Sequence, residues 1–219
     1  MMQINSRLAA VAAVVVMAPA VSGCGVNAIP TNEERAQAEW ANVQAAYQRR
    51  ADLIPNLVAT VQAAAVAERT TLTEVIEARS RATSIQVSPE TLNDPAAFQR
   101  YQAAQDELSR GLGRLLLVAE QYPQIQSNQN FIALQSQLEG TENRINVARR
   151  DYNEAVRVHN TALRTFPTVI WASTIHSGSK PMTLFSANAA AQSAPTVAFD
   201  VGPGGAAAGA APGSAPPAR

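Results

Sequence analysis

Apolar residues recur at helical spacing along three long stretches of this chain, and this periodicity predicts an all-α protein. The first stretch follows Thr31 and Glu34, which have the spacing of a capping box at a helix N-terminus. Its apolar stripe consists of Trp40, Val43, Tyr47, Ile54, Leu57, Val61, Ala64, Leu72, Val75 and Ile76. Because the stripe continues towards Arg79, we expect one helix of about 50 residues, on the order of 70 Å long. Pro55 crowds the carbonyl four residues before it, so this helix should bend near Ala51 without ending.

Two further stripes predict two more long helices. The second helix should begin at Asp94-Pro95 and end before Pro123, since proline suits the first turn of a helix but not its interior. Ser127 and Asn128 can cap the third helix, which Pro167 should end. The second stripe is Phe98, Tyr101, Gln105, Leu108, Leu112, Leu115, Val118 or Ala119, and Tyr122. The third is Phe131, Leu134, Leu138, Ile145, Ala148, Tyr152, Ala155, His159, Ala162 and Phe166.

The connections between these helices are too short to cross their length, so the helices should run up, down and up. The sequence therefore predicts an elongated antiparallel bundle of three long helices over residues 31–167. Ser88-Pro89-Glu90 should open a short connecting helix between the first two. Residues 168–200 lack a sustained period and should form an irregular segment on or beside the bundle. Residues 201–219 consist almost entirely of Gly, Ala, Pro and Ser, a composition typical of disordered tails.

The N-terminal residues have the features of a bacterial lipoprotein signal. Arg7 precedes an apolar run from Leu8 to Ala20, and Val21-Ser22-Gly23-Cys24 resembles a lipobox. A transmembrane span and an ordinary secretory signal are the alternatives, but the apolar run is shorter than the roughly 20 residues of a span. We therefore expect a signal peptide over residues 1–23, lipidation of Cys24 with acyl chains such as palmitate, and a linker over residues 24–30.

Composition argues against several classes of function. The chain has 17 basic and 17 acidic residues, which gives no indication of nucleic-acid binding. Its one cysteine would be acylated, and it has only two histidines, so we expect no disulfide, no metal site and no cofactor. His159 lies on an apolar stripe, where a hydrogen-bonded core histidine is the usual explanation. No catalytic motif is present, and the sequence predicts that the protein is not an enzyme.

The segment from Arg49 to Val58 combines charges, a proline and an asparagine inside a predicted helix. Its candidate binding residues are Arg49, Arg50, Asp52, Pro55 and Asn56. One hypothesis is a polar notch at the bend that receives a ligand or partner. The other is local: Asp52 pairs with an arginine, and Asn56 satisfies backbone groups freed by Pro55.

A second polar segment runs from Glu142 to Asn153 in the third helix. Its candidate residues are Glu142, Asn143, Arg149, Arg150, Tyr152 and Asn153. A neighbouring helix could bring these side chains near Pro55 and form a buried polar network that fixes register. A solvated helix face is the alternative interpretation.

Residues 27–200 resemble the LemA family. The resemblance is carried by RRADLIPNLVATVQ (49–62), LLLVAEQYPQIQSNQNFIALQSQLEGTENRINVARRDYNEAVRVHN (115–160), and a closing pattern from Phe185 through Ala194-Pro195 to Val197 and Phe199. It implies a helical bundle held at a bacterial membrane, with no established reaction. Members commonly begin with a short transmembrane helix, whereas this chain has a lipobox at Cys24, and the tail after Asp200 is an addition.

Together these features predict a membrane-anchored, non-enzymatic scaffold or adaptor of the cell envelope. The alternative is a periplasmic protein that binds a peptide or anionic ligand at a polar notch near Pro55. Expected partners are the membrane, through the lipid on Cys24, and an envelope protein such as a membrane protease; a homo-oligomer would cover any apolar strip left by three helices. Since Gly25 replaces the aspartate associated with inner-membrane retention, we expect the outer membrane, facing the periplasm.

Overall fold

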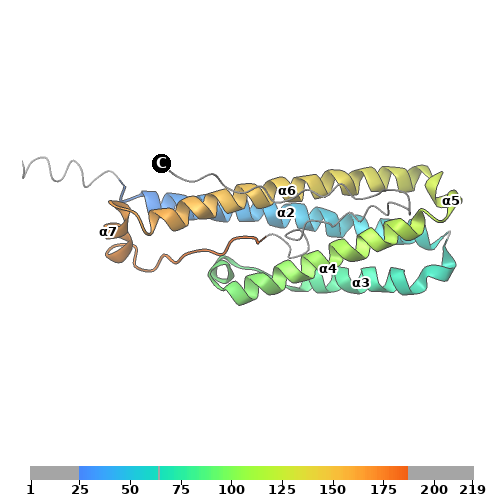
Figure 1. Cartoon of the computed structure of the whole chain (residues 1–219), viewed down its shortest axis with the longest axis horizontal. Coiled ribbons are helices and arrows are strands. Elements are labelled where there is room, and N and C mark those ends of the chain that lie inside the picture. The colour runs from blue at the N-terminus through green and yellow to red at the C-terminus, as the bar shows by residue number, and fades with distance from the viewer. Residues whose placement is uncertain (1–24, 64, 187–219) are drawn as a thin grey trace, which may run out of the picture. The chain divides into compact units, whose positions relative to one another are not determined.

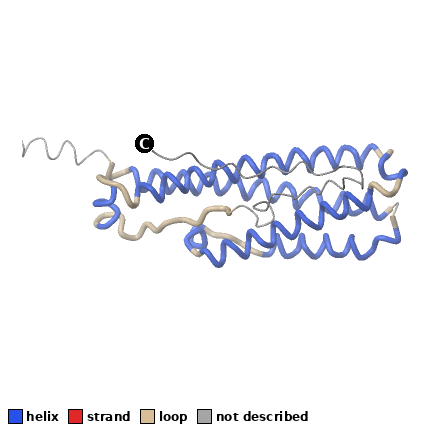
Figure 2. The backbone as a smooth tube through the Cα atoms, in the orientation of Figure 1, coloured by secondary structure: helices blue, strands red, loops and turns tan. Residues whose placement is uncertain are grey.

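The structure is a computed structural model that describes residues 25–63 and 65–186. The predicted signal peptide, Cys24 and the tail after residue 200 lie outside these residues. The described residues contain α-helices, 3-10 helices and connecting segments but no strand, which confirms the predicted all-α bundle (Figures 1 and 2). The elements are α2 (Ala28–Gln62), η1 (Val66–Glu68), α3 (Arg69–Ser84), η2 (Pro89–Asn93), α4 (Pro95–Ala119), α5 (Pro123–Gln126), α6 (Gln129–Ala162) and α7 (Thr168–Ser173). None of the described helices is long and apolar enough to cross a bilayer.

The first predicted helix is wrong in its length, because the chain turns after Gln62 and begins a new helix at Arg69. Alanine-rich sequence around the turn favours helix locally, so packing against other helices decides the break. The amide of Ala65 donates to the Val61 carbonyl at 2.8 Å, and the small Ala65 side chain fits the turn with 1% exposed. The bundle in the described residues therefore has four long helices, where the sequence predicted three.

The helix starts follow the predicted caps in two of three cases. Asp94 accepts hydrogen bonds from the amides of Ala96 and Ala97, and Asn128 accepts one from Asn130, as expected of N-cap side chains. The expected capping box at Thr31 and Glu34 is wrong, because α2 already begins at Ala28. Pro30 lies in this first turn, where its missing amide hydrogen costs no helical bond. The expected single turn after Ser88 is confirmed as η2.

The four long helices run alternately up and down, with α2 packed along α6 and α3 along α4 (Figure 1). At 1.5 Å per residue, α2 and α6 are each about 50 Å long. The shorter α3 and α4 cover only part of this pair. Residues 174–178 form turns after α7. An extended segment, residues 179–185, then runs back along the helices and meets η2, where the Thr183 amide donates to the Leu92 carbonyl at 2.8 Å.

The core consists of two groups of buried side chains. One joins α2, α3, α4 and the first half of α6; its members include Ile54, Leu57, Leu72, Val75, Leu108, Leu115, Phe131 and Leu138. The other joins the first halves of α2 and α4 to the second half of α6 and to the extended segment; its members include Trp40, Tyr47, Phe98, Tyr101, Tyr152, Met182 and Phe185. The predicted stripes are buried almost throughout. Ile76 and Phe166 are errors of this prediction. Ile76 is 51% exposed on α3, and Phe166 is 77% exposed because α6 already ends at Ala162.

Candidate functional site

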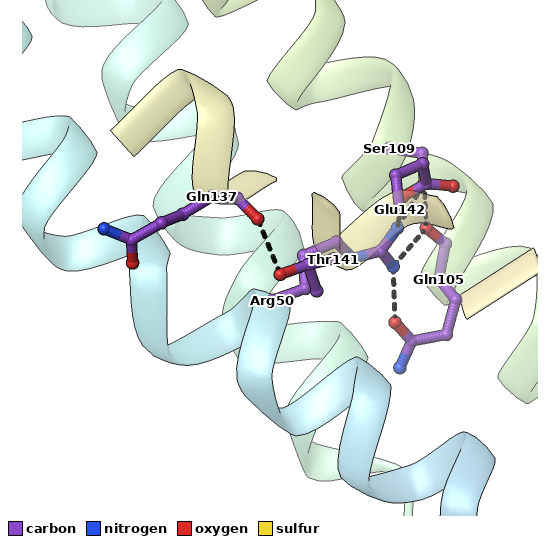
Figure 3. A network of polar contacts seen from close by, with 6 residues as sticks. All are labelled: Arg50, Gln105, Ser109, Gln137, Thr141 and Glu142. Atoms are coloured by element: carbon purple, nitrogen blue, oxygen red, sulfur yellow. Dashed lines mark hydrogen bonds and ion pairs between the residues drawn. The ribbon is translucent and has the colours of Figure 1, made fainter. Parts of the chain in front are cut away.

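The centre of the polar interior is Arg50 on α2, a charged side chain that is only 2% exposed. Its Nη1 donates to the Ser109 hydroxyl at 2.6 Å and to the Glu142 carboxylate at 3.1 Å. Its Nη2 donates to the side-chain and backbone oxygens of Gln105 at 2.8 and 3.2 Å (Figure 3). The guanidinium carbon also lies 5.0 Å from the ring centre of Tyr47. These contacts replace the water that a buried cation loses.

The Arg50 network spans all four long helices. Gln105 on α4 turns its amide nitrogen to the carbonyl of Ala82 on α3, at 3.2 Å, while Arg50 itself comes from α2 and Glu142 from α6. Among the polar atoms of Arg50, only Nε lacks a hydrogen-bond partner within the described residues. The network therefore joins all four long helices, and it uses nearly all the donors of its cation.

A groove of about 350 Å³ lies over this network, between α4 and α6. Its lining consists of Arg50, Ser109, Leu112, Gly113, Leu116, Leu138, Glu139 and Glu142. The Glu142 side chain is 48% exposed, so solvent reaches the network at its carboxylate end. The arginine end is already paired inside the bundle.

A second groove, of about 440 Å³, separates α2 from α6 and contains other predicted site residues. Arg49 lines it from α2, and Asn143 and Arg144 line it from α6. Glu39 and Asp151 add carboxylates to the same lining. The structure thus brings Arg49 and Asn143 together, in a different groove from Arg50 and Glu142.

The surroundings of Pro55 differ from the local interpretation. The expected pairing of Asp52 with an arginine is replaced by a 2.7 Å hydrogen bond from Gln48, four residues earlier. Asn56 and Pro55 are both exposed on α2. The carbonyl freed by the proline belongs to Ala51, and Arg79 on α3 donates to it; Asn56 does not take this role.

The remaining candidates hold the extended segment against α6. Asn153 receives the Phe185 amide at 2.9 Å and donates to the Phe185 carbonyl at 3.1 Å. Asn160, seven residues later, repeats this pair of bonds with Met182, with both distances 2.9 Å. The Tyr152 hydroxyl donates at 2.9 Å to the carbonyl of Thr183, which lies between Met182 and Phe185.

Arg149 and Arg150 lie on either side of this face of α6. The guanidinium carbon of Arg149 is 4.5 Å from the ring centre of Phe185, within cation-π range. Arg150 is exposed to solvent. Seven of the predicted residues of the polar notch are therefore divided among the Arg50 network, the groove between α2 and α6, and the contacts with residues 182–185. The other four, Asp52, Pro55, Asn56 and Arg150, belong to none of these places.

Buried tyrosines surround Trp40 in the second core group. The ring centres of Tyr101 and Tyr152 lie 5.4 and 5.3 Å from that of Trp40, and Tyr47 packs against Tyr101 at 5.7 Å. Burial raises the pKa of all three tyrosine hydroxyls, because the charged phenolate loses hydration inside the bundle. A raised pKa favours the protonated hydroxyl, and the hydroxyl of Tyr152 donates to the Thr183 carbonyl.

The described residues contain no group of three His, Cys, Asp or Glu side chains that could hold a metal ion. His159 is fully buried, and its Nε2 lies 3.2 Å from the Lys180 carbonyl. Since a carbonyl only accepts, Nε2 is the donor, as expected for a hydrogen-bonded core histidine. His159 therefore helps to hold the segment around Lys180 against α6.

Three important residues were not predicted as site residues. Gln105 appears in the sequence as one polar residue in an apolar stripe, and that exception was the available signal. Asn160 stands seven residues after Asn153, on the same face of a helix. Arg79 carried no signal, because its contact depends on the turn between α2 and α3.

Comparison with known proteins shows that part of this chain is similar to magnetosome proteins. Magnetosome protein MamQ of Magnetospirillum gryphiswaldense is 27% identical over 159 residues, which cover 64% of this chain and 58% of the relative. Magnetosome protein MamQ 2 of Paramagnetospirillum magneticum is also 27% identical, over 157 residues with the same coverage. The chain thus aligns with less than two thirds of the length of these curated relatives. The LemA family model matches residues 39–199, which include the Arg50 network and the contacts of residues 182–185, and the chain belongs to the LemA family.

Proposed function

We propose that this protein is a non-enzymatic scaffold or adaptor of the bacterial cell envelope, anchored to a membrane. The observation that carries the proposal is the way Arg50 is paired. A ligand-binding arginine keeps donors free for its ligand. Here both terminal nitrogens of Arg50 form hydrogen bonds inside the bundle, so the densest polar cluster serves to hold four helices in register.

The proposed anchor is a lipid on Cys24, which would leave the bundle outside the cytoplasm. An aspartate directly after the lipidated cysteine is associated with retention in the inner membrane. Residue 25 is glycine, which supports a location at the outer membrane, facing the periplasm. Membership in the LemA family and the likeness to magnetosome proteins support a role at a membrane. Two or more acyl chains would hold the protein stably.

The proposed partner is an envelope protein, such as a membrane protease, that contacts a face of the α2 and α6 pair. These two helices present about 50 Å of continuous surface. The groove between them offers both carboxylates and guanidinium groups, which suits a protein surface of mixed charge. A homo-oligomer formed through the same face is the alternative arrangement.

A second candidate function is the binding of a peptide or anionic ligand. The observation that favours it is the groove of about 440 Å³, where Arg49, Asn143 and Arg144 stand together with solvent access. Arg50 would take no part, because its donors are paired. A thermal shift produced by envelope peptides, and lost in Arg49→Ala, would support this function over the scaffold.

Site-specific photo-crosslinking in cells tests the scaffold. A benzophenone amino acid replaces Val147, which lines the groove between α2 and α6 and is 38% exposed. Ile132 is the matched control, since it lies on the same helix and is 45% exposed but does not line this groove. Both are made in the full chain, with and without Cys24→Ser.

The proposal expects an adduct with one envelope protein at Val147 that depends on Cys24 and is absent at Ile132. Equal adducts at both positions, or none, would contradict it. Self-adducts at Val147 alone would transfer the role to an oligomeric structural element.

A further inference from the structure

One end of the bundle carries exposed apolar side chains that the core does not use. Phe166, Val169, Ile170 and Ile175 are 77, 36, 46 and 63% exposed, and all lie in or beside the short helix α7. The other exposed large apolar residues of the described part stand apart from one another, on α3, α4, α6 and the extended segment. Clustering within ten residues therefore distinguishes the α7 end from ordinary surface exposure.

This apolar end lies beside the N-terminal end of the described chain. A Cβ atom added to Gly25 would come within 3.2 Å of the Thr168 side chain, so the backbone passes closely over the start of α7. The ring of His176 lies 2.9 Å from the Val26 carbonyl, and the Ser179 hydroxyl donates to Glu33 at 2.8 Å. Gly25 also has a φ of +126°, a backbone conformation that other residues rarely adopt.

Charge on this part of the chain is compatible with bacterial phospholipid. From Ala155 to Ser186 the sequence contains no aspartate or glutamate, although Glu33, at the start of α2, accepts a hydrogen bond from Ser179 at this end. Arg164 and Lys180 in the same stretch are exposed. Anionic headgroups attract such basic side chains within a Debye length of the surface.

We propose that the α7 end docks on the surface of an anionic phospholipid bilayer, with Phe166, Val169, Ile170 and Ile175 in the interfacial region. The inference rests on the proposed anchor, because Cys24 precedes Gly25 directly and consecutive Cα atoms are about 3.8 Å apart. Acyl chains on Cys24 would therefore enter the bilayer next to Thr168. The exposed basic side chains Arg164 and Lys180 at this end favour an anionic lipid surface over a second protein as the occupant.

Such docking would give the bundle a fixed orientation as well as an attachment point. The start of α2 and the end of α6 would face the bilayer, and the Arg50 network would lie farther from it along the helices (Figure 1). Interfacial apolar side chains and a lipid anchor are two membrane signals that reinforce each other.

The two tryptophans allow a direct test in the full-length protein. Trp40 is buried in the core with 3% exposed, whereas Trp171 lies in α7 and is partly exposed. The difference in fluorescence between the wild type and Trp171→Phe reports Trp171 alone. The protein is reconstituted into phosphatidylethanolamine and phosphatidylglycerol vesicles that contain lipids brominated on the acyl chain, and flotation verifies that it stays bound.

If the α7 end docks on the bilayer, brominated lipid should quench more than half of the Trp171 fluorescence, and aqueous iodide should quench little of it. Quenching by iodide alone, or by neither agent, in protein that floats with the vesicles would overturn docking and leave the anchor intact. Protein that fails to float despite an intact Cys24 would overturn the anchor and the docking together.

A pair of matched variants tests the residues. Ile170→Asp places a charge on the proposed surface, and Ile76→Asp places one on α3 at a similar exposure of 51%. The first should lose most of the quenching by lipid while the protein still floats, and the second should retain it. Equal quenching in both would contradict the assignment of the surface.

Discussion

Arg79 on α3 donates from its Nε to the carbonyl oxygen of Ala51 on α2, at 2.8 Å. This carbonyl is the one that Pro55 leaves without a helical donor, because proline has no amide hydrogen to offer four residues back. The helix runs on through Pro55 to Gln62, and a neighbouring helix supplies the missing hydrogen bond. Helix α3 therefore supplies the hydrogen bond that Pro55 removes from α2.

Replacement of Arg79 should destabilise the fold through this carbonyl. We expect Arg79→Met to lower the free energy of unfolding by about 1 to 2 kcal/mol, since the Ala51 oxygen would lose its charged donor while partly buried. Urea unfolding followed by circular dichroism measures the loss.

The contribution of the hydrogen bond between Arg79 and Ala51 can be isolated with Pro55→Ala, which restores an amide hydrogen at position 55. In that background the Ala51 carbonyl has a helical donor, so Arg79→Met should cost about 1 kcal/mol less than in the wild type. Costs that simply add would show that Arg79 contributes through its other contacts.

Arg50 and Glu142 should differ sharply in their contributions, although they form one ion pair of 3.1 Å. Arg50→Met removes the hydrogen bonds that Gln105 and Ser109 accept from the guanidinium inside the bundle, and we expect the free energy of unfolding to fall by about 2 to 4 kcal/mol. Glu142→Gln should cost at most about 1 kcal/mol, because its side chain is half exposed and water replaces the partner. Equal losses in urea unfolding would mean that the ion pair, and not the buried hydrogen bonds, dominates the network.

The periodicity of the sequence was enough to predict the helical class, the buried faces and two of the N-caps. Asp94 and Asn128 act locally, so a few residues of sequence determine them. The turn after Gln62 could not be predicted in this way, because the alanines there favour helix and the apolar stripe stays in phase. The turn forms because two shorter helices packed against each other are more stable than one long helix.

The sequence could predict several residues of the candidate site, but it could not predict which of them contact one another. Arg50 and Glu142 were both candidates, and the structure joins them. Their partner Gln105 occupies a stripe position, and a polar residue on an apolar face gives no direction to its bonds. The sequence places Asn153 in a notch because it carries no information on how residues 182–185 return to α6.

The extended segment should depend on the amide groups of α6. Asn153→Asp keeps the acceptor for the Phe185 amide but removes the donor to the Phe185 carbonyl and adds a charge beside it. We expect faster hydrogen exchange at the Met182 and Phe185 amides, by about tenfold for each 1.4 kcal/mol of lost stability. Asn146→Asp, on an exposed position of the same helix, is the control. Unchanged exchange in Asn153→Asp would show that burial of Phe185 alone holds the segment.

Stability should fall at alkaline pH because of Tyr47, Tyr101 and Tyr152. Burial raises the pKa of each hydroxyl in the folded state above the ordinary value of 10.0. Well below pH 10 both states are protonated and nothing is lost; as the pH rises through 10 the unfolded chain loses protons that the folded chain keeps. The free energy of unfolding should then fall with pH, by at most about 1.4 kcal/mol per pH unit for each tyrosine. Lys180 is the only lysine, so few other groups titrate in this window.

Urea unfolding at a series of pH values above 10 measures this slope, and Tyr47→Phe isolates one contribution. Phenylalanine fills the same space but has no proton to lose, so the free energy of unfolding of the variant should fall less steeply with pH. Below pH 10 the two proteins should have parallel stability curves. A slope that Tyr47→Phe leaves unchanged would show that water reaches this hydroxyl and that its phenolate forms in the folded bundle.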